Sequence, residues 1–270
     1  MTYLSRIRIN PLRAVSRKLL SSPRAMHGAV MGGVPGGPGD GGRVLWRLDA
    51  EDAHRPHLFV LTASRPDWTH VIEQAGWPGA DGEHAAVRDY APLLKQIAPG
   101  REFSFRLTAS PVQNTASPKA PTPTQAARLA AATGDERVRG FRLGHRTATA
   151  QLRWFLKRTE GWGFDVPLSR TDPPAPGLGE GLPPNGPDAP PVDTDDPGPA
   201  REVRITARHR HAFKKNGKGA AVTFHSVTFE GRLRVTDSEA FTSRLLGGIG
   251  PSKAYGCGLL TLAHVTGGGR

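Results

Sequence analysis

Alternating hydrophobic and polar residues mark the predicted strands of this chain. Residues 3–9 (YLSRIRI) and 101–111 (REFSFRLTASP) place an apolar side chain at nearly every second position, as a strand with one buried face does. Residues 43–49 and 57–64 predict a hairpin. Two longer runs flank the Asn-Gly pair at 216–217 and predict another hairpin, because Asn-Gly between strands is a strong turn signal. The pattern therefore predicts a chain rich in paired strands.

Apolar residues at helical spacing, together with capping residues, lie between these strands. Residues 11–20 predict a helix whose apolar face carries Leu12, Val15, Leu19 and Leu20. Capping or spacing signals predict four more helices, at residues 22–33, 67–76, 147–163 and 237–248. The second helix has a clear start, with Ser22 as the N-cap and Pro23 at the first helical position. Helices thus connect strands in both halves of the chain.

The order of the predicted elements is the same in both halves: approximately strand, helix, strand, strand, helix, strand. This order predicts an α+β protein with two tandem ferredoxin-like (RRM-like) domains and antiparallel sheets. We place the N-terminal domain at residues 1–98 and the C-terminal domain at residues 99–270. Residues 171–200 hold ten prolines, five glycines, six acids and no Lys or Arg. We expect this segment to be a disordered insertion, because it has too few apolar residues to bury a core.

The charge of the chain points to a class of partner. The 270 residues include 36 Lys and Arg against 24 Asp and Glu, which gives a formal net charge of +12 and a pI near 10.6. Such an imbalance favours a polyanionic partner, most often nucleic acid. The alternative is a basic surface without a binding role. A composition bias that enriches Arg together with Ala, Gly and Pro would also raise the charge.

Other classes of protein are disfavoured by what the chain contains. Its single cysteine, Cys257, excludes an intramolecular disulfide and a cysteine-cluster zinc site. No apolar run approaches the roughly 18 residues that a membrane helix needs. The start, MTYLSRIRIN, reads as a strand and not as a signal peptide. We therefore expect a cytoplasmic protein with no membrane partner.

A glycine-rich stretch with one lysine lies at residues 247–258 (GGIGPSKAYGCG). A phosphate-binding P-loop follows a strand and precedes a helix, whose N-terminal N–H groups meet the phosphate. Here a predicted helix comes first and a strand follows, so we expect neither ATP nor another small-molecule cofactor. Glycine-loop amides can still bind an anion, aided here by Ser252 and Lys253. The alternative is a helix C-cap followed by a long turn.

Together with the residues that follow it, this stretch (residues 247–263, GGIGPSKAYGCGLLTLA) resembles the C-terminal glycine-rich signature of a known family. The family is the CasE (Cse-type) CRISPR repeat-RNA endoribonucleases of the type I-E Cascade complex. Four further segments resemble that family in order along the chain: MTYLSRIRIN, PHLFVLTASRPDW, REFSFRLTASPV and VTFEGRLRVTDSEAF. The resemblance implies two packed ferredoxin-like domains. It also implies metal-independent cleavage at the base of a CRISPR repeat stem-loop, after which the RNA stays bound and the protein joins the other Cascade subunits.

The resemblance also assigns candidate catalytic residues. Histidine suits proton transfer because its pKa lies near neutrality, but the chain has ten histidines and composition does not choose among them. The family's catalytic histidine lies in the helix that matches residues 22–33, which points to His27. The family often has a tyrosine three residues earlier, where this chain has Arg24. One helical turn places Arg24 beside His27, where it can contact the scissile phosphate but cannot act as a tyrosine hydroxyl.

Two further groups of residues are candidates for RNA binding. Strand alternation is expected to place Arg204, Arg208 and Arg210 on one face of a basic hairpin, suited to the phosphates of an RNA stem. The predicted RNA-binding set joins this hairpin to the glycine loop: Arg204, Arg208, Arg210, Lys214, Lys215, Lys218, Gly248, Gly250, Ser252 and Lys253. A solvated charged hairpin with no ligand is the alternative.

The sequence favours a metal-free reaction and leaves two other functions open. No HExxH motif or EF-hand loop is present, and the acids outside residues 171–200 are sparse and show no paired spacing, which disfavours a two-metal nuclease. We expect 2′-OH attack that leaves a 2′,3′-cyclic phosphate and a 5′-OH. The first alternative is a non-catalytic subunit that only binds the RNA hairpin, for which Arg24 is the best support. The second is an RRM-type protein for single strands, disfavoured because no RGFGFV-like strand is present.

Overall fold

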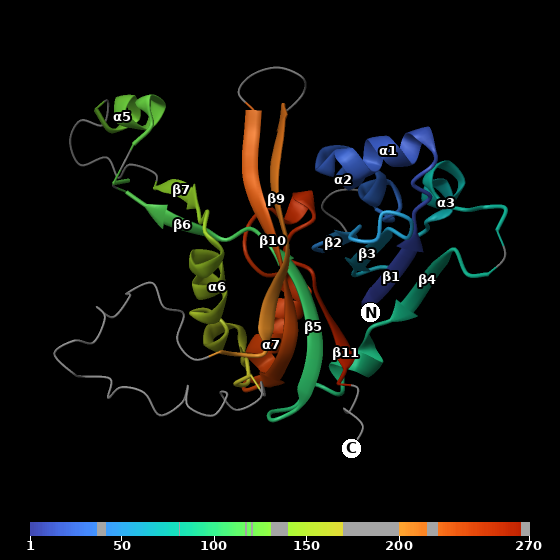
Figure 1. The fold of residues 1–270 in the computed structure, drawn as a ribbon. Helices are drawn as coiled ribbons and strands as arrows, with labels where there is room; N and C mark the ends of the chain where they lie inside the picture. Colours follow the sequence, from blue (N-terminus) through green and yellow to red (C-terminus); the bar gives the residue numbers. More distant parts are fainter. Residues whose placement is uncertain are drawn as a thin grey trace, which may run out of the picture.

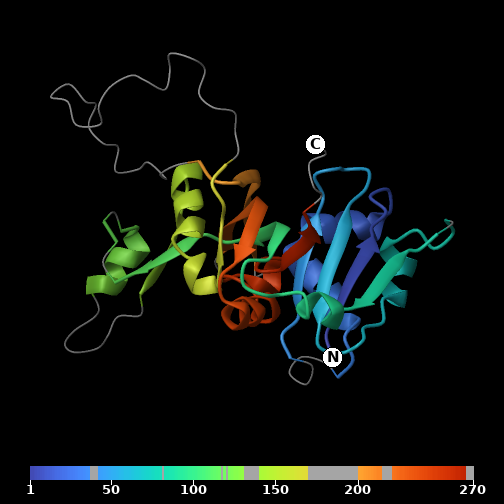
Figure 2. The ribbon, with the colours of Figure 1, turned by 90° about the horizontal axis from the view of Figure 1, so that it is seen from below.

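The computed structural model describes residues 1–36, 42–80, 82–116, 118–119, 121–130, 140–169, 200–214 and 221–265. Two main antiparallel sheets lie side by side and carry helices (Figures 1 and 2), and two further strands form a separate ribbon. The predicted insertion at 171–200 lies outside the described residues, apart from Ala200. Among the residues described, no helix has both the length and the apolar character needed to span a membrane.

The first sheet is built by the N-terminal part of the chain. Its strands pair in the order β2-β3-β1-β4, and every pair is antiparallel. The strands are β1 (Tyr3–Arg8), β2 (Leu45–Asp49), β3 (His57–Thr62) and β4 (Ala85–Asp89). The helices are α1 (Ala14–Ser21), α2 (Pro23–Gly32), α3 (Thr69–Ala75) and the short α4 (Ala91–Leu94). A core that includes Ile7, Met26, Val30, Leu58 and Val71 joins the first three helices to the sheet.

One predicted helix face is wrong. α1 begins at Ala14, so Leu12 precedes it, and Leu12 and Val15 are 75% and 42% exposed. The buried residues of α1 are Ser16 and Leu19, and the Ser16 hydroxyl donates a hydrogen bond to the carbonyl of Ala75 at 3.0 Å. Packing against α3 therefore buries a face that contains a serine, which a search for apolar spacing passes over.

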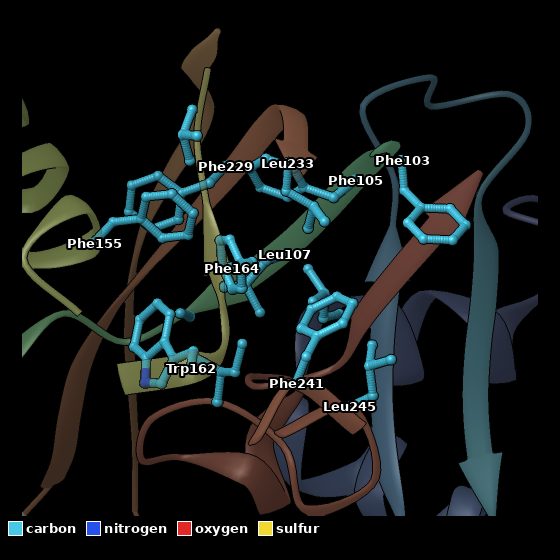
Figure 3. Close-up of a cluster of buried hydrophobic side chains, with 14 of the residues drawn as sticks. Phe103, Phe105, Leu107, Phe155, Trp162, Phe164, Phe229, Leu233, Phe241 and Leu245 are labelled. Carbon is cyan, nitrogen blue, oxygen red and sulfur yellow. The ribbon is translucent and has the colours of Figure 1, made fainter. Parts of the chain in front are cut away.

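The second sheet belongs to the C-terminal part and repeats the same plan. Its strands pair in the order β11-β5-β10-β8, and β9 also pairs with β10. The strands are β5 (Glu102–Ala109), β8 (Phe164–Asp165), β9 (Val203–Lys214), β10 (Ala221–Val235) and β11 (Leu260–His264). Helices α6 (Ala148–Leu156) and α7 (Ser238–Gly247) contribute to its aromatic core, which contains Phe155, Phe164, Phe229 and Phe241 (Figure 3). The predicted fold class, α+β with two tandem ferredoxin-like units and antiparallel sheets, is confirmed.

Some elements extend or shorten the predicted plan. A two-stranded ribbon of β6 (Val112–Thr115) and β7 (Phe141–Gly144), with α5 (Pro123–Ala130), is inserted before α6. The helix expected at 147–163 ends at Leu156, and a 3₁₀ turn, η1 (Glu160–Trp162), follows. Gly163 ends that turn with φ 82°, and a Cβ there would collide with the carbonyl of Asp237. Gly163 thus lets the chain turn into β8 close to the start of α7.

A buried arginine joins the two sheets. Arg47 of β2 is 1% exposed, and its Nη1 donates hydrogen bonds to the carbonyl of Arg106 and to Thr261 Oγ1, both at 2.9 Å. The Arg47 Nε also pairs with Asp49 Oδ1 at 2.6 Å. Burial alone raises the pKa of Asp49, but hydrogen bonds and charges from Arg47 and Arg106 hold it below its ordinary value. This charge-satisfied contact fixes β2 against β5 and β11.

Candidate active site

Helix α2 carries the two candidate catalytic residues. It begins as predicted: Ser22 Oγ accepts a hydrogen bond from the N–H of Ala25 at 3.2 Å, and Pro23 occupies the first turn. Met26 and Val30 are fully buried and anchor the helix in the first core. This anchoring fixes the rotation of α2, and it leaves His27 half-buried.

The environment of His27 favours its neutral form. Burial lowers the pKa of His27 below its ordinary value of 6.5. Its Nδ1 is buried and has no hydrogen-bond partner among the described residues. Arg24, one turn earlier on α2, is exposed. A neutral imidazole with an arginine one turn away is able to accept a proton near an anionic group.

The glycine loop packs against the first sheet. Its short 3₁₀ turn, η3 (Lys253–Tyr255), contacts both α2 and β2. A Cβ added at Gly248 would lie 2.6 Å from Leu45 Cδ2, and one added at Gly256 would lie 2.8 Å from Trp46 Cζ3. Both glycines also have positive φ values, 76° and 83°. They are therefore required for a close approach between the two halves of the chain as well as for the turn.

Several backbone amides of the loop are already occupied. Gly248 caps α7, with its N–H donating to the carbonyl of Arg244 at 2.8 Å, which is the arrangement of the C-cap alternative. The N–H groups of Ile249, Tyr255 and Gly258 donate to other backbone carbonyls at 2.7–2.9 Å. Anion binding by this loop would therefore depend on its other groups, among them Gly250, Ser252 and Lys253.

Positive charge gathers at Lys253. Burial lowers the pKa of the Lys253 ammonium, and the nearby charges of Arg43 and Arg244 lower it further. Arg43 precedes β2, and Arg244 lies in the last turn of α7. Neither arginine was predicted as a site residue: Arg244 lies just before the loop in sequence, and only the fold brings Arg43 to it. Together they form a basic cluster suited to a phosphate.

The predicted arrangement of arginines on the hairpin is wrong. The pairing of β9 with β10 shifts register between Thr228 and Phe229, so β9 contains a bulge. Arg204 pairs across from Glu230, whereas Arg208 pairs across from Val227, and these two β10 residues point to opposite faces. Arg204 therefore lies on the face opposite to Arg208 and Arg210. A bulge reverses the side-chain alternation, and the sequence carried no clear sign of it.

The hairpin arginines also differ in their partners. Arg204 forms an ion pair with Glu230 at 3.2 Å, and the Arg208 Nε donates to Gln151 Oε1 of α6 at 2.9 Å. Arg210 is exposed. Lys214 ends β9, and Lys215 and Lys218 lie outside the described residues. Arg204, Arg208 and Arg210 are all exposed, and Arg208 and Arg210 lie on the face away from α2.

The opposite face of the hairpin is aromatic and was missed from the sequence. His211 stacks on Phe224 with ring centroids 4.6 Å apart, and Phe224 stacks on Tyr255 of η3 at 5.7 Å. Phe213 meets Tyr255 edge to face at 4.9 Å. The signal was the alternation of His209, His211 and Phe213 in HRHAF, which places them opposite Arg208 and Arg210.

A cleft separates this aromatic face from α2. The cleft has a volume of about 540 Å³. Its walls come from both halves of the chain, including Pro23, Met26, Trp46, His209, His211 and Tyr255. Figure 1 shows the long β9–β10 hairpin rising beside α2. The structure therefore brings together α2, the glycine loop and the hairpin, while Arg208 is held at α6 on the other side.

No group of three or more His, Cys, Asp or Glu that could hold a metal ion is found in the described part of the chain. The expectation of metal-free chemistry stays a prediction. The assigned roles of His27, Arg24 and the RNA-binding residues also stay predictions.

The fold and the site define a class of protein: two ferredoxin-like units with helix α2, a glycine loop and a long hairpin around one cleft. Among the described residues that line this cleft, neither His27 nor Arg24 is found. The chain belongs to the CRISPR associated protein family, whose model matches residues 2–264. The resemblance to CasE (Cse-type) proteins is confirmed.

One named relative matches over almost the whole chain, and a second matches over a short segment. The chain is 28% identical over 265 residues to the CRISPR-associated endoribonuclease Cse3 of Thermus thermophilus, covering 97% of this chain and 99% of that protein. It is 44% identical over 48 residues to the CRISPR system Cascade subunit CasE of Escherichia coli, covering 18% of this chain and 24% of that protein. A structure of CRISPR endoribonuclease Cse3 bound to 19 nt RNA has a TM-score of 0.64 and 25% identity, covering 97% of this chain and 99% of that one.

Proposed function

We propose that this protein is an endoribonuclease that cleaves CRISPR precursor RNA at the base of the repeat hairpin and keeps the mature guide RNA bound as a Cascade subunit. The names of the relatives support an RNA-cleaving role, since Cse3 is an endoribonuclease and CasE is a Cascade subunit. The observation that carries the proposal for this chain is the environment of His27. The side chain is half-buried, burial lowers its pKa and so favours the neutral form, and the helix that holds it is capped and anchored.

The proposed reaction needs only the RNA and protein side chains. His27 removes the proton from the 2′-OH next to the scissile phosphate, and the 2′-oxygen attacks phosphorus. The bond from phosphorus to the 5′-oxygen breaks, and that oxygen takes a proton from the imidazolium or from water. The products are a 2′,3′-cyclic phosphate and a 5′-OH. Arg24 stabilises the negative charge that develops on the phosphate oxygens.

Binding is separate from this proton chemistry in the proposal. The cluster of Lys253, Arg43 and Arg244 holds the RNA backbone near α2, and Arg210 contacts a phosphate of the stem. We place the domain boundary at residues 98 and 99, between α4 and β5. We place the protein in the cytoplasm, where its proposed substrate is transcribed.

The reaction type is tested with a modified substrate. The cognate repeat hairpin is cut under single-turnover conditions in EDTA, and the same hairpin with one 2′-deoxynucleotide before the mapped cut serves as the comparison. We expect the first RNA to be cut and the second to be bound but left intact. Cleavage of the deoxy substrate, or loss of all cleavage in EDTA, would contradict the proposed mechanism.

A non-catalytic RNA-hairpin-binding subunit is the second candidate. Arg24, where the family often has a tyrosine, is the observation that favours it. This candidate predicts tight, salt-sensitive binding of the repeat hairpin by the wild-type protein, with no cut product at any protein concentration.

A further inference from the structure

The cleft between α2 and the hairpin has a lining suited to a neutral, flat ligand. Its α1–α2 and β2 sides are apolar and include Leu19, Leu20, Pro23, Met26, Trp46 and Leu48. Its sheet side carries hydroxyl groups that already have one hydrogen-bond partner each: Thr108 and Thr228 bond each other at 2.9 Å, and Ser226 bonds His211. A concave apolar site with a few hydrogen-bonding groups on one side is the usual form of a small-ligand pocket.

The charge of the lining argues against a phosphate in this cleft. Among the described residues that line it, none is a lysine or arginine, and its one carboxylate, Glu51, already pairs with Arg106 at 3.3 Å. The two lining histidines, His209 and His211, lie at 6.2 Å centroid separation. Burial lowers the pKa of His211, and the nearby charges of His209 and His225 lower it further. The backbone phosphates of an RNA would therefore stay outside, at the basic cluster around Lys253.

The rings at the cleft are already arranged in a stack. Tyr255 lines the cleft, packs on Phe224, and through Phe224 is continuous with His211. His211 is held in place by a 2.8 Å hydrogen bond between its Nε2 and Ser226 Oγ. Rings fixed in this way favour stacking with another planar ring, and a nucleobase stacks on aromatic side chains whatever its identity.

We propose that this cleft is a slot for one unpaired nucleobase of the bound RNA, turned out of the strand beside α2 and placed next to the aromatic stack. This proposal rests on the proposed function, because it takes the ligand to be the RNA that α2 would cut. A base held in the slot fixes the rotation of its nucleotide and so helps to orient the neighbouring phosphate toward His27.

Two protein variants test the slot. Ala207→Phe adds a ring to a residue of β9 that lines the cleft, and should fill it. Tyr255→Leu removes one ring, and Tyr255→Phe keeps that ring as the conservative control. Ala98→Phe adds the same bulk as Ala207→Phe at an exposed residue between α4 and β5. Thermal unfolding of each full-length variant shows whether it is folded.

The probe is the repeat hairpin with an uncleavable 2′-deoxynucleotide at the cut, carrying one abasic nucleotide at each unpaired position in turn. We expect one abasic position to weaken wild-type binding on the order of tenfold. Ala207→Phe and Tyr255→Leu should weaken binding of the complete RNA by a similar factor, and should have less than a twofold effect on that abasic RNA. Tyr255→Phe and Ala98→Phe should bind like the wild type.

The proposal is overturned if no abasic position weakens binding by more than twofold, or if folded Ala207→Phe and Tyr255→Leu weaken the complete and abasic RNAs equally. Those results leave the proposed function intact, because the wild type still binds and cuts the hairpin. A wild type that does not bind the repeat hairpin contradicts both the proposed function and the slot.

Discussion

Gly256 lies against the indole ring of Trp46, so close that a methyl group on Gly256 would be 2.8 Å from Cζ3 of the tryptophan. The contact joins the loop after α7 to β2 of the first sheet. It places Tyr255 at the cleft and Lys253 beside Arg43. The glycine loop thus owes its position to a contact between the two halves of the chain.

Replacing Gly256 should disturb this contact. Gly256→Ala must adopt a positive φ and push against Trp46, so we expect the free energy of unfolding to fall by about 1–3 kcal/mol. Denaturant unfolding measures it. Gly247→Ala is the matched control, since its added Cβ meets no atom within 4 Å and it lies in the last turn of α7. An equal loss for both variants would mean that the Trp46 contact has no special role.

Arg47 should be the more costly residue to lose at the same interface. Arg47→Met keeps the length of the side chain but leaves Asp49 and the Arg106 carbonyl without this donor, and we expect a loss of about 3–5 kcal/mol. Arg88→Met is the control, because the Arg88–Glu83 pair is exposed, with 73% and 49% side-chain exposure, and should contribute under about 1 kcal/mol. Similar unfolding midpoints for the two variants would contradict the assigned importance of Arg47.

The pH dependence of cleavage should reflect the burial of His27. A lowered pKa means that the neutral, proton-accepting form persists to more acidic pH than for an exposed histidine. The single-turnover rate should therefore rise with pH and reach its plateau with a midpoint below about 6.5. The profile is measured with saturating protein, so that RNA binding does not limit the rate. A midpoint clearly above this value would argue against His27 as the base.

The two faces of the hairpin should contribute differently to RNA binding. Arg210 is exposed on the face away from α2, whereas Arg204 lies on the other face and pairs with Glu230. We expect Arg210→Ala to weaken hairpin binding and to reduce the slope of log K against log salt by about one. Arg204→Ala should change that slope less. Binding titrations at several salt concentrations decide the matter, and equal slopes would contradict the separation of the two faces.

The sequence predicted the architecture well because local signals agreed with it. The strict alternation in β5 predicts a strand with one buried face, and the capping residues of α2 predict the start of a helix. The order of such elements then predicts the ferredoxin-like plan twice. Local signals failed where a contact with a distant residue, or an irregularity within a strand, decides which way a side chain points. Ser16 is buried only because α3 offers a carbonyl, and Arg204 changes face because of a bulge within β9.

The cleft could not be predicted from the sequence for a similar reason. Trp46, His211 and Tyr255 are far apart along the chain, and no spacing rule relates them. His27 was different, since a resemblance pointed to it, and its partial burial gives that assignment a physical basis. Its role in cleavage is still a prediction.

The central claim is that His27 carries the proton chemistry of RNA cleavage. The most direct measurement is the single-turnover rate of cutting the cognate repeat hairpin in EDTA by the wild type, by His27→Ala and by His54→Ala, a histidine on an exposed loop. We predict that His27→Ala cuts about 10²–10⁴ times more slowly while binding the RNA equally well, and that His54→Ala cuts like the wild type. Equal cutting by His27→Ala and the wild type would contradict the account.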